Sequence, residues 1–421
     1  MDFEPSERSR EHTERVRRFV ACHVEPFEDD WRRELRAACP EGDWRRWRVP
    51  ARVEELKARA REEGLWNLFL PDPTLGGGLS TLDYAPVAEA MGRSPLAPEV
   101  FNCNAPDTGN MEVLYHYGSD EQKHCWLTPL LAGEVRSVFC MTEPDVASSD
   151  ATNMRATAVI EGDEVVLEGT KWWSTGLGHP RAAVAIVLAH TPDPQADRHH
   201  QHSMLLVPLD APGVEILRML PVYGDFDPPY GHGEVRFRGV RLPLSSLIGG
   251  PGRGFEIAQG RLGPGRIHHA MRCVGAAERA LELAIDRGLS RVAFGKPLID
   301  LGGNRERIAE ARLAIDQARL LTLWAAWKLD QLGAHGAMTE ISAIKVVAPN
   351  VLARVVDDAI QLHGGAGLGE DTPLAAFFAQ ARSLRLADGP DEVHRALIAR
   401  LEISRRKAAR GESPPRGGPA Q

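Results

Sequence analysis

The sequence predicts an α+β protein in which a helical region, a β region and a second helical region follow one another. Three observations support this order. Apolar residues recur at helical spacing up to about residue 136, alternate with polar residues up to about 250, and then return to helical spacing. We therefore expect domains at 1–136, 137–250 and 251–410, followed by a disordered tail at 411–421.

The composition is that of an ordinary globular protein of 421 residues. A net charge of −8 argues against a nucleic-acid-binding surface. We find no apolar run near the ~20 residues of a membrane helix, and the polar start MDFEPSERSREHTERVRR does not resemble a secretory signal. The six cysteines are scattered without a C-x-x-C pair, so we expect free thiols and a cytoplasmic protein.

In the first region, turn and capping residues mark the ends of the expected helices. The stretch ARVEELKARAREE (51–63) stops at Gly64, which can end a helix. Ser119 is followed three residues later by Gln122, and this spacing predicts a capping box at the start of another helix.

In the second region, TAVIEGDEVVLEG predicts a hairpin that turns at Glu161-Gly162-Asp163. Further strands are expected in AAVAIVLAH, SMLLVPLD, VEILRMLP and GEVRFRGVRL. Because no helical stretch separates these strands, we expect a small antiparallel barrel or sandwich.

In the third region, helical spacing predicts helices at 255–287, 304–333, 339–362, 373–386 and 391–409. The preceding segment GGPGRGFE follows a strand and opens a helix, but it lacks both the Rossmann and the P-loop glycine pattern. A nucleotide cofactor would therefore have to bind in another way.

Three short stretches carry groups that could act chemically, and each has a structural alternative. The loop FCMTEPDVASSDATN (139–153) could hold an anion or the edge of a flavin, or it could be a strand that runs into a turn. In EGTKWWSTG (168–176) one Trp should point inward and the other outward, as core and surface or as a wall against a flat cofactor. In RLADGPDEVH (385–394) Asp388 is either a helix cap or a catalytic base.

Two clusters of basic residues are also visible. One lies along a single expected helix and is either a solvated face or an anion site: Arg261, Arg266, His268, His269 and Arg272. The other is DRHHQHS (197–203), whose His199, His200 and His202 lack a closed metal-ligand spacing. We expect that segment to be a surface loop, and we expect no metal site.

Four motifs in the same order resemble the acyl-CoA dehydrogenase family. MTEPDVASSD and KWWSTG are similar to the family's T-E-P-x-x-G-S-D and K-x-W-I-T-N, SRVAFGKPL (290–298) to R-x-x-F-G-x-x-L, and AIQLHGGAGLGEDTPL (359–374) to Q-x-x-G-G-x-G. The segments GPGRGF, QGRLGPGRIHH and LRLADGPDEVH resemble most the branch whose animal members carry a fused kinase-like domain.

The resemblance implies an N-terminal helical domain, a middle antiparallel β-barrel domain, a C-terminal four-helix bundle and bound FAD. It also implies FAD-dependent α,β-dehydrogenation of an acyl-CoA thioester to the trans-2-enoyl-CoA, with base and flavin on opposite faces of the substrate. A 4-hydroxy or 4-phospho acyl-CoA is a candidate substrate, an electron-transfer flavoprotein the expected acceptor, and a homodimer or homotetramer the expected assembly. The alternative is a flavin oxidase similar to the nitroalkane oxidases, with Asp388 as base.

By position, the resemblance makes Asp388 the base, where the family usually has a longer glutamate. Gly265, where some members place the base instead, supplies no carboxylate. The resemblance assigns FAD contacts to Phe139, Met141, Thr142, Ser148, Ser149, Trp173, Ser174, Thr175, Arg291, Phe294, Gln361, Gly364, Gly365, Pro390 and Glu392. It assigns substrate contacts to Ser149, Arg261, Arg266, His269 and Gly389.

Overall fold

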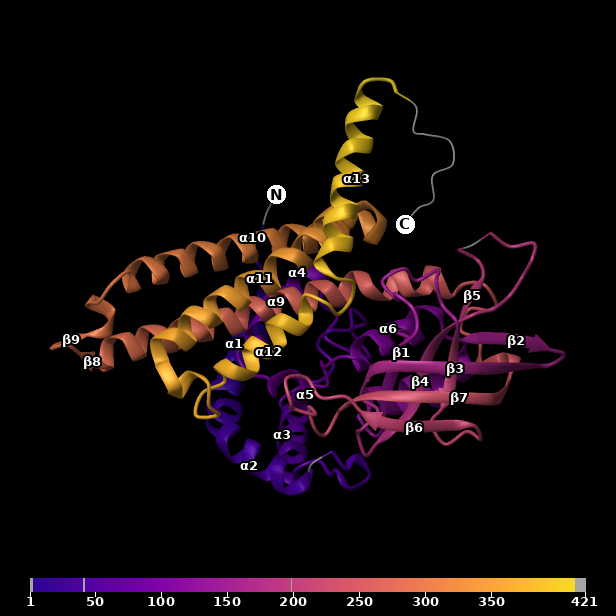
Figure 1. The fold of residues 1–421 in the computed structure, drawn as a ribbon, viewed down its shortest axis with the longest axis horizontal. Helices are drawn as coiled ribbons and strands as arrows, with labels where there is room; N and C mark the ends of the chain where they lie inside the picture. Colours follow the sequence, from indigo (N-terminus) through magenta and orange to yellow (C-terminus); the bar gives the residue numbers. More distant parts are fainter. Residues whose placement is uncertain (1–2, 41, 198, 413–421) are drawn as a thin grey trace. The chain divides into compact units, whose positions relative to one another are not determined.

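The computed structural model describes residues 3–40, 42–197 and 199–412, and its elements follow the predicted order of helices, strands and helices (Figure 1). The chain divides into two compact units. The helical unit comprises Met1–Asp29, Leu79–Pro98 and Gly263–Gln421, and the β unit comprises Asp30–Gly78 and Glu99–Leu262. The domain limits at 136 and 250 stay a prediction, and most of the expected tail, 413–421, lies outside the described residues.

Short helices lie at the start of the β unit. They are α2 (Glu28–Ala38), α3 (Ala51–Glu62), α5 (Ala97–Val100), α6 (Asp107–Tyr117), α7 (Asp120–Gln122) and α8 (Thr128–Leu131). The predicted capping box is present at α7, because Gln122 N donates to Ser119 Oγ at 3.2 Å and Ser119 N donates to Gln122 Oε1 at 3.0 Å. A π-helical turn, η4 (Lys123–Leu127), separates α7 from α8.

A seven-stranded sheet forms the rest of the β unit. Its strands are β1 (Arg136–Cys140), β2 (Thr157–Glu161), β3 (Glu164–Thr175), β4 (Ala182–His190), β5 (His202–Pro208), β6 (Val214–Met219) and β7 (His232–Pro243). The β2–β3 hairpin turns at Gly162, as predicted, and β3–β7, β6–β7 and β4–β5 also pair antiparallel.

The sheet differs from the predicted antiparallel barrel because β4 pairs in parallel with β1 and, at Thr157 and His190, with β2. Parallel neighbours need a long connection, and the β2–β3 hairpin supplies it between β1 and β4. Alternating apolar residues reveal which face of a strand is buried, but they carry no information on the direction of its neighbour. The core of the sheet is built from side chains such as Val165, Leu167, Val235 and Phe237, all of them buried.

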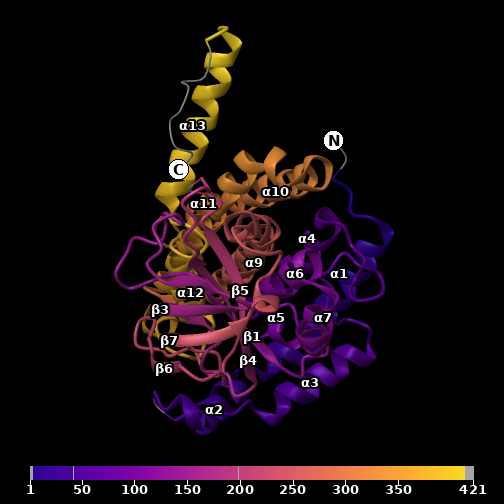
Figure 2. The ribbon, with the colours of Figure 1, turned by 90° about the vertical axis from the view of Figure 1, so that its right-hand side faces the viewer.

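The helical unit contains the long helices of the chain, which match the predicted ranges closely. Its elements are α1 (Glu7–Phe19), α4 (Thr81–Gly92), α9 (Gly254–Ser290, from Gly263 onward), β8 (Val292–Ala293), β9 (Lys296–Pro297), α10 (Asn304–Gly336), α11 (Met338–His363), α12 (Leu374–Leu384) and α13 (Asp391–Ala409). Helices α10 and α11 lie side by side in both views (Figures 1 and 2).

Alanines dominate the core between α9, α10, α11 and α12, including Ala277, Ala280, Ala318, Ala325 and Ala348. Small side chains let helix backbones approach closely, so the packing matches the expected four-helix bundle. In the described part of the chain, no helix is both long and apolar enough to cross a membrane. All six cysteines are free thiols.

Candidate active site

Asp388 lies in a tight turn of the helical unit, between the end of α12 at Leu384 and the start of α13 at Asp391. Its backbone is left-handed, with φ 54°, and Gly389 follows with φ 97°. Pro390 is the N-cap residue of α13, and no described side chain caps this helix by a hydrogen bond. Asp388 is therefore not a helix cap, which removes one of the two roles considered from the sequence.

Three basic side chains hold the main chain of this turn. Arg266 Nη2 donates to the carbonyl oxygen of Asp388 at 3.0 Å, and His394 Nε2 lies 3.1 Å from the same oxygen. Lys345 Nζ donates to the carbonyl oxygen of Gly389 at 3.1 Å. Because these groups engage carbonyls, the turn itself sets the direction of the Asp388 carboxylate.

The carboxylate of Asp388 is partly exposed, and His269 Nε2 lies 3.8 Å from its Oδ2. Burial lowers the pKa of His394 to about 4, so its ring is neutral at physiological pH. Burial also lowers the pKa of the Lys345 ammonium, an effect that the negative charge of Asp388 opposes. The turn therefore contains a neutral histidine and a lysine near the candidate base.

Asp391, close to Asp388 in sequence, is buried, and its negative charge is balanced by neighbouring arginines. Its Oδ2 accepts hydrogen bonds from Asn350 Nδ2 at 2.9 Å and from Arg385 Nε at 3.0 Å. Burial raises the pKa of Asp391, but these donors and the arginine charges hold it below its ordinary value. Glu392 is well exposed. The FAD contacts assigned to Pro390 and Glu392 from the sequence stay predictions.

The basic residues along α9 do not form a solvated face, contrary to one expectation from the sequence. His268 and Arg272 are buried, and the His268 ring packs edge-on against Tyr84 with centroids 4.8 Å apart. Arg266 holds the Asp388 turn, and His269 lies next to its carboxylate. Each residue has a separate role, which helical spacing alone could not reveal.

In the β unit, a buried ion pair joins two of the motifs found in the sequence. Lys171 Nζ donates to Glu143 Oε1 at 2.7 Å and to the Met141 carbonyl oxygen at 2.9 Å. The main chains of the two motifs are also hydrogen-bonded: Trp172 N donates to the Thr142 carbonyl oxygen at 3.0 Å. Both charged side chains are almost fully buried, so this pair fixes the loop that begins at Thr142-Glu143-Pro144, here called the TEP loop, against β3.

Sequence reasoning missed Glu143 and Lys171, although both lie inside the quoted motifs. The Glu143 carboxylate also accepts from Arg155 N at 2.7 Å and Ala156 N at 3.0 Å. A charge within an otherwise apolar or hydroxyl-rich stretch is the signal that could have identified them, since such a charge is seldom buried without a partner.

A β-bulge interrupts β3 at the two tryptophans. The register of β3 against β7 shifts between Lys171 and Ser174, and Trp173 adopts φ 53°. Trp173 is 42% exposed, whereas Trp172 is partly buried and its Nε1 has no partner among the residues described. One Trp is therefore more buried and the other exposed, as predicted, although the sequence did not predict the bulge that interrupts the strand between them.

The bulge places Ser174 in the core and Thr175 at its edge. Ser174 is buried beside Cys140, so a cofactor contact of Ser174 would have to come from its main chain. Thr175 Oγ1 lies 2.9 Å from His232 Nδ1 on β7. In the TEP loop, Glu143 N donates to Ser148 Oγ at 2.8 Å, and Ser149 is exposed.

Phe139, on β1, has one face covered by an arginine. The guanidinium carbon of Arg261 lies 3.8 Å from the Phe139 ring centroid, and Arg261 Nε donates to Asn110 Oδ1 at 3.3 Å. This stacking is a cation–π contact. Arg261 was predicted to bind an anion of the substrate, and in the structure its planar group packs against a predicted flavin contact.

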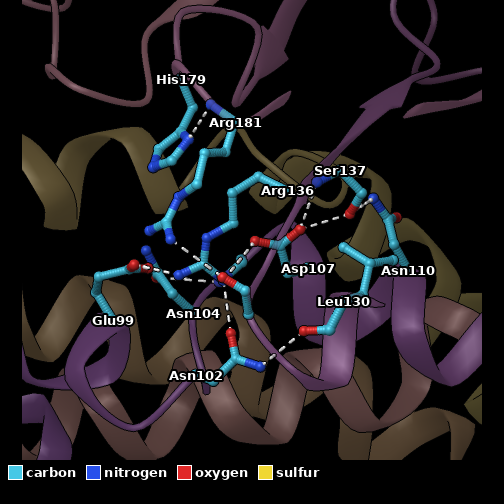
Figure 3. A network of polar contacts seen from close by, with 12 residues as sticks. Glu99, Asn102, Asn104, Asp107, Asn110, Leu130, Arg136, Ser137, His179 and Arg181 are labelled. Atoms are coloured by element: carbon cyan, nitrogen blue, oxygen red, sulfur yellow. Dashed lines mark hydrogen bonds and ion pairs between the residues drawn. The ribbon is translucent and has the colours of Figure 1, made fainter. Parts of the chain in front are cut away.

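Figure 3 shows a buried polar network at the start of β1. Arg136 Nη1 donates to Asn102 Oδ1 at 2.5 Å and to Asp107 Oδ2 at 3.2 Å, and Arg136 Nη2 pairs with Glu99. Ser137 N and Oγ donate to Asp107 Oδ1 at 2.7 and 2.5 Å. The network fixes the strand that carries Phe139, and no sequence motif marks its partners.

Three predicted FAD contacts of the helical unit are highly accessible. Phe294, between β8 and β9, is 97% exposed, and Arg291 and Gln361 are also exposed. Gly364 has φ 64°, but Gly365 has an ordinary φ, and no described atom lies within 4 Å of a Cβ built on it. Neither backbone strain nor packing within the described chain explains the glycine at 365.

The histidine-rich segment forms a loop and a strand end. His200 Nδ1 lies 2.8 Å from Asp197 Oδ2, and His202 is buried in β5. Burial lowers the pKa of His202 to about 4. Among residues 3–40, 42–197 and 199–412, no group of three or more His, Cys, Asp or Glu side chains is arranged to hold a metal ion.

The order of helical, β and helical elements and the acidic turn before α13 agree with the family whose motifs the sequence resembles. Family models described as the N-terminal, middle and C-terminal domains of acyl-CoA dehydrogenase match residues 6–134, 138–240 and 252–402. This chain belongs to the acyl-CoA dehydrogenase family.

Three comparisons illustrate the range of similarity. Acyl-CoA dehydrogenase family member 11 of Mus musculus is 52% identical over 97% of the chain and 52% of its own length, so the chain spans about half of this relative. A solved structure of a candidate acyl-CoA dehydrogenase from Mycobacterium abscessus is 61% identical, with TM-score 0.92 over 96% of this chain and 100% of that one. An FAD complex of PigA is 25% identical, with TM-score 0.80 over 96% and 100%.

The similarity to family member 11 confirms the branch that the motifs indicated. The fold predicted from that resemblance is confirmed as well, apart from the parallel pairing of β4 with β1 and β2.

Proposed function

We propose that this chain is an FAD-dependent acyl-CoA dehydrogenase in which Asp388 removes the α-proton of an acyl thioester to give the trans-2-enoyl-CoA. The observation that carries this proposal is the turn at Asp388, in which a left-handed backbone presents the carboxylate while Arg266, His394 and Lys345 engage the neighbouring carbonyls. A base on such a fixed support meets the demand of proton transfer for a defined position.

The residues around Asp388 have distinct parts in this proposal. The carboxylate accepts the proton from the carbon next to the thioester carbonyl. The Asp388 main-chain N–H donates to the thioester oxygen, which makes that carbon more acidic. His269 lies 3.8 Å from the carboxylate, where its ring, when protonated, favours the charged form of Asp388. When bound, FAD supplies the acceptor for the hydride that leaves the β-carbon.

The residues fit FAD on three observations. Trp173 presents an exposed aromatic face, Phe294 is almost fully exposed, and Gly365 has space around it that the chain does not use. The FAD complex of PigA supports the same cofactor. The residues that we propose to hold FAD are Phe139, Met141, Thr142, Ser148, Ser149, Trp173, Ser174, Thr175, Arg291, Phe294, Gln361, Gly364, Gly365, Pro390 and Glu392.

The exposed tip at Phe294 supports an assembly of identical chains, because Leu289, Val292 and Phe294 are all exposed there, and a group of exposed apolar side chains marks an interaction site. We propose a homodimer or homotetramer in which Arg291 and Phe294 contact the FAD of a neighbouring copy. An electron-transfer flavoprotein is the acceptor that we propose for the reduced cofactor.

For the substrate, we propose contacts from Ser149, His269 and Gly389, while Arg261 and Arg266 act through Phe139 and the Asp388 turn. Acyl-CoAs with a 4-hydroxy or 4-phospho group are the candidate substrates that the resemblance to the branch with a fused kinase-like domain implies.

Anaerobic bleaching of the purified flavoprotein by a panel of acyl-CoAs tests this function, and the panel should include 4-hydroxy and 4-phospho forms. We expect at least one thioester to bleach the flavin, with little reoxidation by air. If nitroalkanes bleach it instead, and air restores the colour with release of peroxide, the chain is an oxidase with Asp388 as base.

A further inference from the structure

His232 and Asp227 form a polar chain with Thr175 in the β unit. Thr175 and His232 are direct neighbours across the β3–β7 ladder, and their Oγ1 and Nδ1 atoms lie 2.9 Å apart. On the other side of the ring, His232 Nε2 lies 3.4 Å from Asp227 Oδ2. The His232 ring also lies next to Trp173, with ring centroids 6.0 Å apart.

The carboxylate next to Nε2 determines which nitrogen of a neutral His232 carries the proton. Burial and the charge of Asp225 raise the pKa of Asp227 to about 7, so its carboxylate is charged above that pH. A proton on Nε2 then faces this carboxylate, whereas a lone pair there would face a negative charge. Nδ1 is then an acceptor, and the Thr175 hydroxyl has to donate to it. Because its one donor is used, the Thr175 hydroxyl can only accept hydrogen bonds from any further neighbour.

His232 is expected to be neutral under physiological conditions. Burial lowers the pKa of His232, and the nearby Asp225 carboxylate opposes that effect. The charged groups placed around the ring are Asp225 and Asp227, both from the loop before β7. Its direct neighbours on β3, Thr175 and Trp173, are uncharged.

We propose that His232 is a positioning residue that makes Thr175 a hydrogen-bond acceptor toward the bound flavin. This inference rests on the proposed function, in which Thr175 lies next to the flavin ring. The reactive ring nitrogen of a flavin has a lone pair when oxidised and an N–H when reduced. An acceptor at Thr175 therefore favours the reduced form, and His232 raises the reduction potential of the flavin.

The test is the reduction potential of the FAD-loaded protein, measured by equilibration with a reference dye at a pH above the Asp227 pKa of about 7. In His232→Phe, the Thr175 hydroxyl is released and can donate to the oxidised ring. We expect the equilibrium to shift about tenfold toward the oxidised form, on the scale of one hydrogen bond, which is about 30 mV for a two-electron couple. Exposed His124, changed to Gln, is the control and should leave the potential unchanged.

Two further variants separate this role from a general loss of structure. Asp227→Asn removes the charge that orients the ring and suits the left-handed backbone at φ 52°, so we expect a smaller shift in the same direction. In a Thr175→Val background, His232→Phe should cause no additional shift, because the effect passes through the hydroxyl.

The outcomes also separate this inference from the proposed function. An FAD-loaded protein that is bleached by acyl-CoA, with equal potentials in wild type, His232→Phe and Asp227→Asn, overturns the inference alone. If His232→Phe shifts the reduction potential equally in the wild type and in the Thr175→Val background, the inference is overturned as well. A folded protein that takes up no FAD overturns both the function and the inference.

Discussion

Arg266 Nη2 donates a hydrogen bond to the carbonyl oxygen of Asp388, and the distance between the two atoms is 3.0 Å. The arginine therefore acts on the main chain next to the candidate base. A substitution at 266 should change where the carboxylate points, and the tightness of substrate binding should change little.

Arg266→Lys should lower kcat by about 10- to 100-fold with little change in KM, because displacement of a catalytic group by about 1 Å costs on this order. Lysine retains the charge but lacks the planar fork of donors. Steady-state kinetics with the best acyl-CoA and the FAD content of the variant would measure this. A raised KM at unchanged kcat would instead assign Arg266 to substrate binding.

Gly389→Ala should destabilise the turn and the activity together. The backbone φ of 97° is unfavourable for alanine, and its Cβ would lie 2.9 Å from His394 Nε2. We expect a loss of about 1–3 kcal/mol in the free energy of unfolding, measured by urea denaturation. Gly369→Ala is the matched control, since its new Cβ meets described atoms only at 3.8 Å or beyond. Equal stability of the two variants would show that the turn tolerates a side chain.

Glu143→Gln and Lys171→Met should each cost about 3–5 kcal/mol in the free energy of unfolding, because each leaves a buried charge without its partner. The double variant should lose less than the sum of the two. Both single variants should also retain less FAD, since the pair holds the TEP loop. For comparison, Glu164→Gln breaks a half-exposed pair with Arg241 and should cost at most about 1 kcal/mol.

Acid should weaken the protein partly through His394. Its folded-state pKa of about 4 lies below the ordinary 6.5, so between these values the unfolded chain binds more protons. The contribution of the neutral His394 ring to the free energy of unfolding is fully present above pH 6.5 and is lost as the pH falls to about 4. This contribution is at most about 3 kcal/mol.

Unfolding free energies of wild type and His394→Gln at pH 7, 5.5 and 4.5 would test this. The variant should be less stable at pH 7 and should show a shallower decline. Exposed His335→Gln should decline as the wild type does. Parallel declines for wild type and His394→Gln would exclude His394 as a source of the acid sensitivity.

Regular elements were predictable because their signals are local. Helical spacing located α9, α10, α11 and α13 within a few residues, and Ser119 with Gln122 located a capping box. These features depend on periodicity and on contacts between residues three or four positions apart. The resemblance in four motifs added the family, which local patterns could not supply.

The missed features depend on contacts between residues far apart in sequence. The bulge at Trp173 arises from the register of β3 against β7, which no single strand encodes. Arg136 meets Glu99 and Asp107 only once β1 is placed in the sheet. The Asp388 turn could be interpreted as a cap until the structure showed Pro390 in that position.

The central claim is that Asp388 is the base, and anaerobic single-turnover reduction of Asp388→Asn by the best acyl-CoA tests it most directly. Glu402→Gln is the control, since Glu402 is an exposed carboxylate on α13 that pairs, among the residues the structure describes, with its helix neighbour Arg405. We expect Asp388→Asn to retain FAD and to be reduced about 100- to 10,000-fold more slowly than wild type and Glu402→Gln. Reduction of Asp388→Asn at the wild-type rate would contradict the account.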